Sequence, residues 1–296
     1  MAITDEHLKR LHNIDCIQPI ETVEPLVGGL SHHCFKVTSL QQMYFVKLFS
    51  TNQSLSGYCN TSHCQVNPAH HLTIQHAAYL KGFSAKIIEA DELGSYMVCE
   101  YIDGVTLLNS TANDTTKLKS LANILAKCHQ LDAAVAPLDL LSVVESLIVK
   151  CPLTQADKQK IITRFNTQLK QVTVNVGDLV LCHGDVNFSN IILKGEDSFL
   201  IDWEYCCLAE AEYDIAMAIS INKLSTNQQL IFLEYCHNSY SVNVKPSFST
   251  DKVHMYLALC NIINALWFEQ QPANVEGCSL LNEHDHFNGF IQNFLR

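Results

Sequence analysis

The sequence predicts an α+β fold with two lobes, a β-rich N-terminal lobe over residues 1–101 and a mainly helical C-terminal lobe over residues 102–296. Three observations carry this prediction. Short runs of aromatic and β-branched residues, separated by turn residues, dominate the N-terminal third of the chain. Apolar residues at helical spacing dominate the remainder. A chain of 296 residues is also long enough for two lobes that each bury a core.

The N-terminal lobe is predicted to begin with a short helix over residues 4–14. Thr4 suits the N-cap of that helix, and Asp5 and Glu6 place negative charge in its first turn. Apolar and β-branched runs then predict strands at residues 24–27, 34–37, 44–49, 85–90 and 95–101. The double glycine at 28–29 indicates a turn between the first two strands, and residues 50–68 are polar enough to form a loop before a helix over 69–81.

The C-terminal lobe shows helical periodicity. The segment 114–131 has one apolar face, formed by Leu118, Leu121, Ala122, Leu125, Cys128 and His129. Further helices are predicted at residues 155–171, 209–222, 226–240, 251–270 and 283–295. A change of pattern near 102–106 marks the join between the lobes, and we expect a ligand cleft there.

The segment 181–205, LCHGDVNFSNIILKGEDSFLIDWEY, interrupts the helices. Apolar runs at 191–193 and 199–201 flank a polar loop with a turn glycine, which predicts a β-hairpin. Asn190 precedes its first strand and Asp202 follows its second, so both lie at the open end, where cross-strand neighbours are about 5 Å apart. An amide and a carboxylate at that distance suit Mg²⁺. Asp185 follows the strand 179–182 and is expected to face the same space as a base.

The order His183-Gly184-Asp185, Asn190 and Asp202-Trp203-Glu204 resembles the choline kinase, thiamine kinase and aminoglycoside phosphotransferase group of small-molecule kinases. The resemblance implies a protein-kinase-like fold and the cofactors ATP and Mg²⁺. It implies that Asn190 and Asp202 hold the metal and that Asp185 accepts or orients the acceptor hydroxyl. His183 stands beside Asp185 in the catalytic loop, where we expect it to fix the loop.

The resemblance extends to the nucleotide site. Gly28, Gly29 and Ser31 stand where the group has its phosphate-covering turn, and Lys47 stands where it has the lysine for the α and β phosphates. Residues 96–104 resemble the linker whose backbone meets adenine, and Glu100 and Ile102 are its candidate residues. In kinases a helix glutamate pairs with that lysine. The helix predicted at 69–81 contains no acidic residue, and Gln75 is the candidate for that position.

The same resemblance points to a cationic acceptor. Glu204, Tyr205 and Trp267 are the candidate acceptor-binding residues, because a carboxylate and aromatic rings attract a quaternary or thiazolium cation. Trp267 fits a core position equally well. Choline, ethanolamine and thiamine are the favoured acceptors, and the net charge of −11 leans the same way. Aminoglycosides, homoserine-like compounds and sugars stay open as alternatives.

Composition narrows the remaining functions. A net charge of −11 argues against a protein that binds nucleic acid through its phosphates. No apolar run approaches the roughly 18 residues that span a bilayer. The N-terminus lacks the apolar core of a signal peptide. A cytoplasmic protein is therefore expected.

Thirteen irregularly spaced cysteines favour reduced thiols over a disulfide framework. The cluster formed by Cys59, His63, Cys64, His70 and His71 is either a surface loop or a zinc site with unusual spacing.

Two other functions compete with the kinase interpretation. A non-catalytic nucleotide-binding pseudokinase would explain the missing helix glutamate, although Lys47, Asp185, Asn190 and Asp202 are all present. A hydrolase that uses Cys182, His183 and Asp185 is disfavoured, because neighbouring side chains at a strand end tend to point apart.

Overall fold

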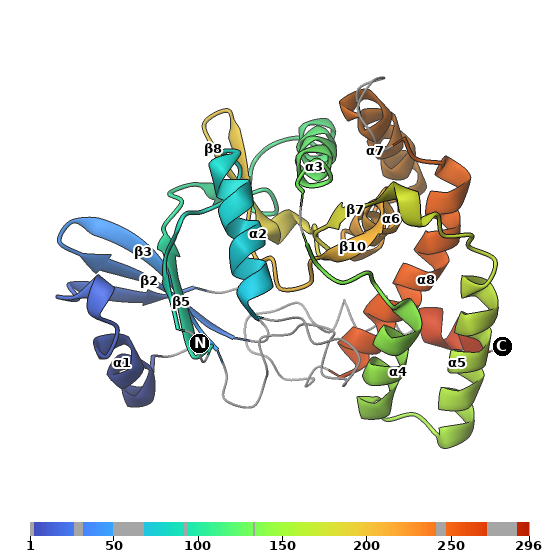
Figure 1. Ribbon diagram of the computed structural model, residues 1–296, viewed down its shortest axis with the longest axis horizontal. Coiled ribbons are helices and arrows are strands. Elements are labelled where there is room, and N and C mark those ends of the chain that lie inside the picture. Colours follow the sequence, from blue (N-terminus) through green and yellow to red (C-terminus); the bar gives the residue numbers. More distant parts are fainter. Residues whose placement is uncertain are drawn as a thin grey trace.

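The computed structural model describes residues 3–26, 32–49, 68–91, 94–132, 134–240, 247–270 and 289–295. Its N-terminal part is a five-stranded antiparallel sheet with the order β1-β2-β3-β5-β4. The strands are β1 (Thr22–Pro25), β2 (His33–Ser39), β3 (Gln42–Leu48), β4 (Ile87–Ala90) and β5 (Tyr96–Glu100). Figure 1 shows this sheet at one end of an elongated molecule, in blue to teal, with the helices at the other end.

Helix α1 (Asp5–His12) covers the sheet, together with the 3₁₀ turn η1 (Asp15–Ile17). The Thr4 hydroxyl caps α1 as predicted, since it accepts from the N–H of His7. A small core fills the space between this helix and the sheet. It consists of Leu11, Ile14, Ile17, Phe35, Val37, Val46, Leu48 and Val98. Burial of these apolar side chains fixes the position of β3, the strand that carries Lys47.

Helix α2 (Pro68–Leu80) belongs to the other core, although it lies between β3 and β4 in the chain. Its buried residues Ile74 and Ala78, with Phe83 just beyond, pack in the large cluster that also holds the C-terminal helices. Figure 1 accordingly shows α2 in the middle of the molecule, between the sheet and the helices. The predicted boundary between residues 101 and 102 stays a prediction.

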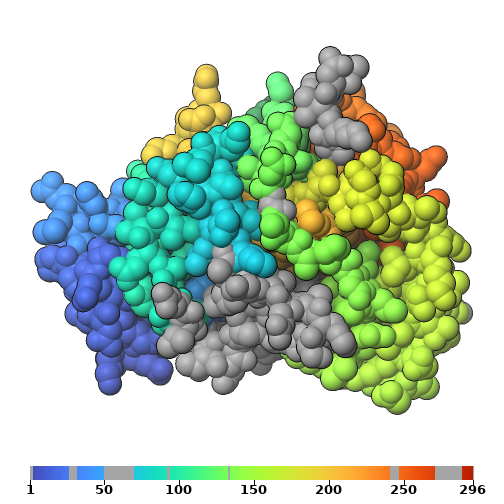
Figure 2. All heavy atoms as spheres, viewed as in Figure 1, coloured from blue at the N-terminus to red at the C-terminus, as the bar shows by residue number. Residues whose placement is uncertain are grey.

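The C-terminal part is built around helix α6 (Ala211–Ile221), which is buried from Ala211 through Ser220. The other helices are α3 (Asp114–Cys128), α4 (Leu140–Lys150), α5 (Gln155–Leu169), α7 (Thr226–Ser239) and α8 (Thr250–Glu269), and residues 289–295 are also helical. Every residue of the predicted apolar face of α3 is buried. On the face that Figure 2 shows, residues up to about 100 lie mainly on the left, in blue to teal, and later residues lie mainly on the right, in green to orange.

Two small sheets lie among these helices. Strands β7 (Leu179–Cys182) and β10 (Cys207–Glu210) form one antiparallel pair, and β6 (Val105–Thr106), β8 (Ile191–Lys194) and β9 (Asp197–Leu200) form the other sheet. The predicted hairpin is confirmed as β8 and β9. Its turn is shorter than expected: Lys194 pairs with Asp197, which leaves Gly195 at φ +62° and Glu196 as the turn.

One other prediction needs correction. The helix predicted from residue 209 begins at Ala211, because Cys207–Glu210 pairs with Leu179–Cys182 as a strand. Helix α4 was not predicted; Asp139 caps it by accepting from the N–H groups of Leu141 and Ser142. Residues 283–288 of the last predicted helix lie outside the described residues, as does the predicted loop through residue 67.

The cysteines that the structure describes are all free thiols, and eight of them are buried. This confirms, for the described residues, the expectation of reduced thiols that pack as small apolar groups. Among the same residues, no helix is both long and apolar enough to cross a bilayer.

Candidate active site

Asn190 and Asp185 meet at the open end of the β8–β9 hairpin. Ile191 pairs with Leu200, and the N–H of Ile201 donates to the carbonyl of Asn190 at 3.0 Å, which places Asn190 just outside the last rung. The Asn190 amide nitrogen donates to the Asp185 backbone carbonyl at 3.0 Å and to its carboxylate Oδ2 at 2.9 Å. Because the nitrogen makes both bonds, Oδ1 is the Asn190 atom suited to a cation.

Asp185 is a half-buried carboxylate whose second oxygen accepts from the Asn187 amide at 3.0 Å. Burial raises the pKa of Asp185 to about 7; the charges of Asp202 and Glu204 act in the same direction, against the hydrogen bonds from Asn187 and Asn190. A carboxyl group with a pKa near 7 can take up a proton at neutral pH. That is the property a general base needs.

Lys47 lies on β3 and is only 5% exposed. Its Nζ donates to Asp202 Oδ1 at 2.8 Å and to Glu204 Oε2 at 3.0 Å, and it sits 5.6 Å from the centre of the Phe49 ring. Burial lowers the pKa of Lys47, but the two carboxylates outweigh burial and hold the pKa above its ordinary value. The side chain is therefore a charged ammonium in the site.

A rigid turn presents Asp202 and Glu204. Trp203 is 2% exposed, and its Nε1–H donates to the Ser84 hydroxyl at 3.0 Å. Asp202 adopts φ +67°, a conformation that costs a non-glycine residue on the order of 1 kcal/mol and persists because the surroundings hold it. The two carboxylates flank the buried indole in the chain and both reach Lys47. His32 Nε2 lies 3.4 Å from Glu204 Oε2.

Asp214 braces the loop that carries Asp185. It is fully buried on α6, and its carboxylate accepts from the backbone N–H groups of His183 and Gly184, both at 2.9 Å. The same carboxylate bonds His129 Nε2 at 3.0 Å, and His129 Nδ1 meets the Tyr240 hydroxyl. Asp214 therefore braces the loop before Asp185, and His129 is a buried, hydrogen-bonded residue of the core.

His183 and Gly184 have structural constraints of their own. Burial lowers the pKa of His183, so the ring is neutral; Nε2 bonds the Ile201 carbonyl at 3.1 Å and Nδ1 accepts from the Asp185 N–H at 3.3 Å. These contacts are those of a residue that fixes the loop. Gly184 has φ +80°, and a Cβ there would lie 2.5 Å from the Tyr205 carbonyl oxygen, so only glycine fits.

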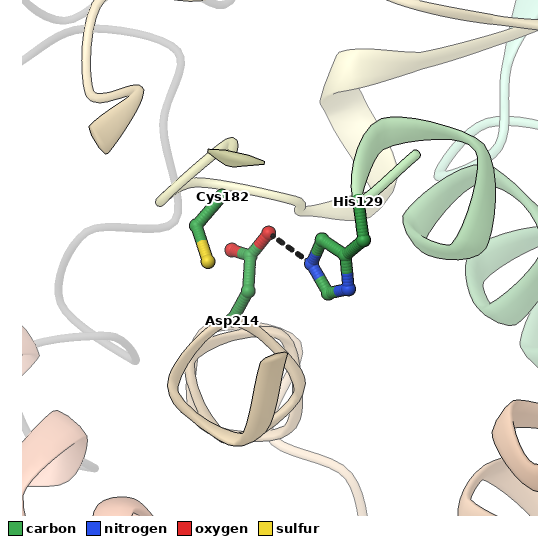
Figure 3. A group of neighbouring side chains, drawn as sticks. All are labelled: His129, Cys182 and Asp214. Carbon is green, nitrogen blue, oxygen red and sulfur yellow. Dashed lines mark hydrogen bonds and ion pairs between the residues drawn. The ribbon is translucent and has the colours of Figure 1, made fainter. Parts of the chain in front are cut away.

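A second group of ligand-type side chains lies beneath this loop. Figure 3 shows His129, Cys182 and Asp214 side by side, and their ligand atoms all lie within 4.8 Å of one another. The Asp214 carboxylate already accepts three hydrogen bonds, and the Cys182 thiol donates to the Glu210 carbonyl at 3.6 Å. Burial raises the pKa of Cys182 well above its ordinary value, which opposes both a thiolate metal ligand and a Cys182-based hydrolase.

A hollow that is partly open to solvent lies beside Lys47. Strand β3, helix α2, the β4–β5 turn and the Asp202–Glu204 turn line it, and the sequence-predicted residues on its wall are Lys47, Gln75, Asp202 and Glu204. The structure therefore brings together residues that are 155 and 157 positions apart, Lys47 with Asp202 and with Glu204.

The remaining predicted site residues are distributed as follows. Gly28, Gly29 and Ser31 lie outside the described residues, as do Cys59, His63 and Cys64 of the predicted zinc cluster. Glu100 is exposed at the end of β5, Ile102 is half-buried two residues later, and Tyr205 is half-buried. Trp267 is half-buried on α8 against the large core, with its ring 5.0 Å from Phe268, and it is not among the residues that line the hollow.

Sequence reasoning did not identify three residues that shape the site. His32 contacts Glu204, Ser84 receives the Trp203 indole N–H, and the His71 ring Nδ1 lies 3.2 Å from the Trp203 carbonyl. Each of these contacts joins residues more than 100 positions apart, and no local pattern around them signals the partner.

Comparison with known proteins identifies the architecture. Residues 22–248 match the family model described as "Phosphotransferase enzyme family". A curated protein, the LicA homolog of Metamycoplasma hominis, is 21% identical over 168 residues, which cover 57% of this chain and 64% of that protein's length.

Two solved structures show the same fold. The choline kinase LicA from Streptococcus pneumoniae has a TM-score of 0.73 at 18% identity, with 97% of this chain and 99% of that chain covered. A choline/ethanolamine kinase family protein from Mesorhizobium loti has a TM-score of 0.70 at 17% identity, with 99% and 94% covered. The predicted α+β, protein-kinase-like fold is thus confirmed.

Proposed function

The chain belongs to the phosphotransferase enzyme family, and we propose on that premise that it transfers the γ-phosphoryl group of ATP to a hydroxyl of a small cationic acceptor. The observation that carries the proposal is a buried ammonium in contact with two carboxylates, whose charges reach the neighbouring Asn190–Asp185 pair and raise the pKa of Asp185. Phosphoryl transfer needs charge neutralisation and alignment more than covalent chemistry, and these groups supply both.

The roles follow from the contacts. Lys47, charged and held at the wall of the hollow, binds the α and β phosphates. Asn190 Oδ1 and the Asp202 carboxylate are hard oxygen donors of the kind that hold Mg²⁺, which when bound neutralises phosphate charge. Asp185, with a pKa of about 7, accepts the proton of the acceptor hydroxyl and orients its oxygen for in-line attack. Glu100 and Ile102 lie in the segment whose backbone meets adenine.

Choline, ethanolamine or thiamine is the proposed class of acceptor. The similar solved structures are a choline kinase and a choline/ethanolamine kinase family protein, and the net charge of −11 favours cations over anions near the site. Tyr205 and Trp267 are the aromatic candidates for cation–π contact. The Glu204 carboxylate bonds Lys47, and its contact with the acceptor stays a prediction.

The test is a panel of hydroxyl acceptors assayed with ATP and Mg²⁺ by coupled ADP release. Choline, ethanolamine and thiamine represent the cationic class, an aminoglycoside the larger cations, and a hexose and homoserine the remaining alternatives. We expect turnover with a small cation. Turnover only with a neutral acceptor would overturn the acceptor class. Magnesium-dependent ATP binding without turnover on any acceptor would identify a pseudokinase instead.

Two variants separate chemistry from binding. Asp185→Asn is expected to lower kcat by about 10²–10⁴-fold, the usual contribution of a general base, while calorimetry still detects ATP. Asp202→Ala is expected to abolish the magnesium-dependent part of ATP binding. Asp178→Asn, at an exposed carboxylate that accepts from the Asn175 amide at 2.6 Å, is the matched control and should behave as the unaltered protein.

A further inference from the structure

Helix α2 supplies no charge to Lys47. The helix, PAHHLTIQHAAYL, contains no acidic residue. Gln75, the candidate for the missing acid, is buried, and its amide nitrogen donates to the Ala85 carbonyl at 3.1 Å and to the Cys99 sulfur at 3.2 Å. Because this amide already bonds Ala85 and Cys99, the buried Lys47 ammonium on β3 needs a counter-charge from an element other than α2.

Both carboxylates on Lys47 come from the Asp202–Glu204 turn, and they differ in exposure. The Asp202 side chain is 36% exposed, whereas that of Glu204 is 15% exposed. His32 Nε2 approaches the same Glu204 oxygen that Lys47 contacts. Asp202 is the more open carboxylate and the better placed for an incoming cation.

The backbone around Glu204 is held on two sides. The Trp203 indole is pinned to Ser84 on one side, and on the other the Trp203 carbonyl bonds His71 of α2. Burial lowers the pKa of His71, so the ring is neutral and its Nδ1–H is the donor to that carbonyl. Helix α2 therefore acts on the lysine site through a backbone contact with the turn, in place of a carboxylate of its own.

We propose that Glu204 is the positioning residue that keeps Lys47 extended toward the nucleotide phosphates, a role that a glutamate on the helix has in other kinases. Asp202 then remains available to bind the divalent metal ion. The proposal rests on the proposed function for the identity of the ligand. Its physical basis is that Asp202 cannot serve a divalent ion and Lys47 equally. When Asp202 turns to the ion, an ammonium that is 5% exposed still has the Glu204 carboxylate as its partner.

The first test compares Glu204→Gln, which removes the charge and keeps the shape, with Glu24→Gln as the control. Glu24 lies on the same sheet, 3.9 Å from Lys36, with a side chain 60% exposed. We expect Glu204→Gln to lower kcat/KM for ATP by about 10–100-fold, as loss of a supporting partner does, with KM for the acceptor unchanged. The control should change neither quantity. A raised KM for the acceptor with unaltered ATP kinetics would overturn the proposal.

A double-mutant cycle measures the interaction between Glu204 and Lys47. If Glu204 acts through Lys47, then Glu204→Gln adds less than about a threefold loss when Lys47→Met is already present. An undiminished loss in that background would mean that Glu204 serves the metal or the acceptor directly. Should Glu204→Gln fail to fold in a thermal unfolding experiment, His32→Ala tests the same arrangement. It removes the second contact of Glu204, and we expect a loss of kcat/KM for ATP that also disappears in the Lys47→Met background.

A third measurement does not depend on turnover. The rate at which an acylating reagent modifies Lys47, followed by peptide mass spectrometry at pH 8–9, reports the neutral fraction of the amine. We expect Glu204→Gln to raise that rate about tenfold or more, because one carboxylate no longer holds the proton. An unchanged rate refutes the positioning role. If the acylation rate rises but the protein phosphorylates no acceptor, the Lys47–Glu204 pairing stands and only the proposed function is refuted.

Discussion

Replacing Asp214 by asparagine is expected to destabilise the fold and to slow the reaction together. The Asp214 carboxylate is fully buried and accepts from two backbone N–H groups of the 183–184 loop and from His129. An asparagine of the same shape keeps one oxygen acceptor and turns an N–H₂ group toward a donor. The loop that holds Asp185 then loses part of its support.

The magnitude follows from these three bonds. A hydrogen bond to a charged group contributes about 1.5–3 kcal/mol, and breaking a buried charged network by removing one partner costs about 3–5 kcal/mol. We therefore expect Asp214→Asn to lower the free energy of unfolding by about 3–5 kcal/mol. With an unfolding entropy of about 2.1 cal/mol/K per residue over 296 residues, that loss lowers Tm by about 5–8 °C.

Urea unfolding and differential scanning calorimetry measure the two quantities, and Asp114→Asn is the matched control. Asp114 is exposed and accepts from the Gln228 side chain at 2.9 Å, so its replacement should cost no more than about 1 kcal/mol. A loss for Asp214→Asn no larger than that of the control would refute the bracing argument. So would a large loss of stability with kcat unaltered, because the loop would then not depend on Asp214.

The structure also predicts how the stabilisation by Asp214 changes with pH. Burial raises the pKa of Asp214, but the hydrogen bonds from His129 and from the His183 N–H outweigh it, so the pKa lies below its ordinary value. A lowered pKa stabilises the fold above the unfolded pKa of about 4, and the gain is lost as the pH falls through the folded pKa. The stability gap between the unaltered protein and Asp214→Asn should therefore be full at neutral pH and narrow only in acid.

Three further predictions follow from single contacts. Because the pKa of Asp185 is raised to about 7, kcat/KM should fall about tenfold per pH unit below pH 7; a flat profile down to pH 5 contradicts its role as a base. Gly184→Ala forces a Cβ onto the Tyr205 carbonyl at φ +80°, so urea unfolding should show a loss of at least about 2 kcal/mol. Trp203→Phe removes the bond to Ser84 and should cost about 2 kcal/mol in the same assay; an unchanged midpoint excludes the pinning role.

Local sequence patterns were sufficient to predict much of the fold. The Thr4 cap, the buried face of α3 and the β8–β9 hairpin all depend on residues within a few positions of each other, so the sequence displays them directly. The order of His183, Asp185, Asn190 and Asp202 belongs to the same class, because one hairpin and the loop before it bring these residues together.

The predictions that the structure did not bear out failed for a different reason. Strand β10 exists because Cys207–Glu210 finds β7 as its partner, a pairing that overrides the helical periodicity read from residue 209 onward. Gln75 was considered in place of the helix acid because of its position in the chain. Its amide instead bonds Ala85 and Cys99, partners that only the packed helix brings within reach.

The sequence by itself determined which chemical groups the protein carries and which short elements hold them, because helix, strand and hairpin preferences act over a few residues. Only the tertiary structure decided that Glu204 pairs with Lys47, 157 positions away, and that Asp214 supports the loop of Asp185. Such pairings depend on which buried charges and backbone donors meet when the sheet and the helices pack. No pattern along the chain records the distance between groups that only folding brings together.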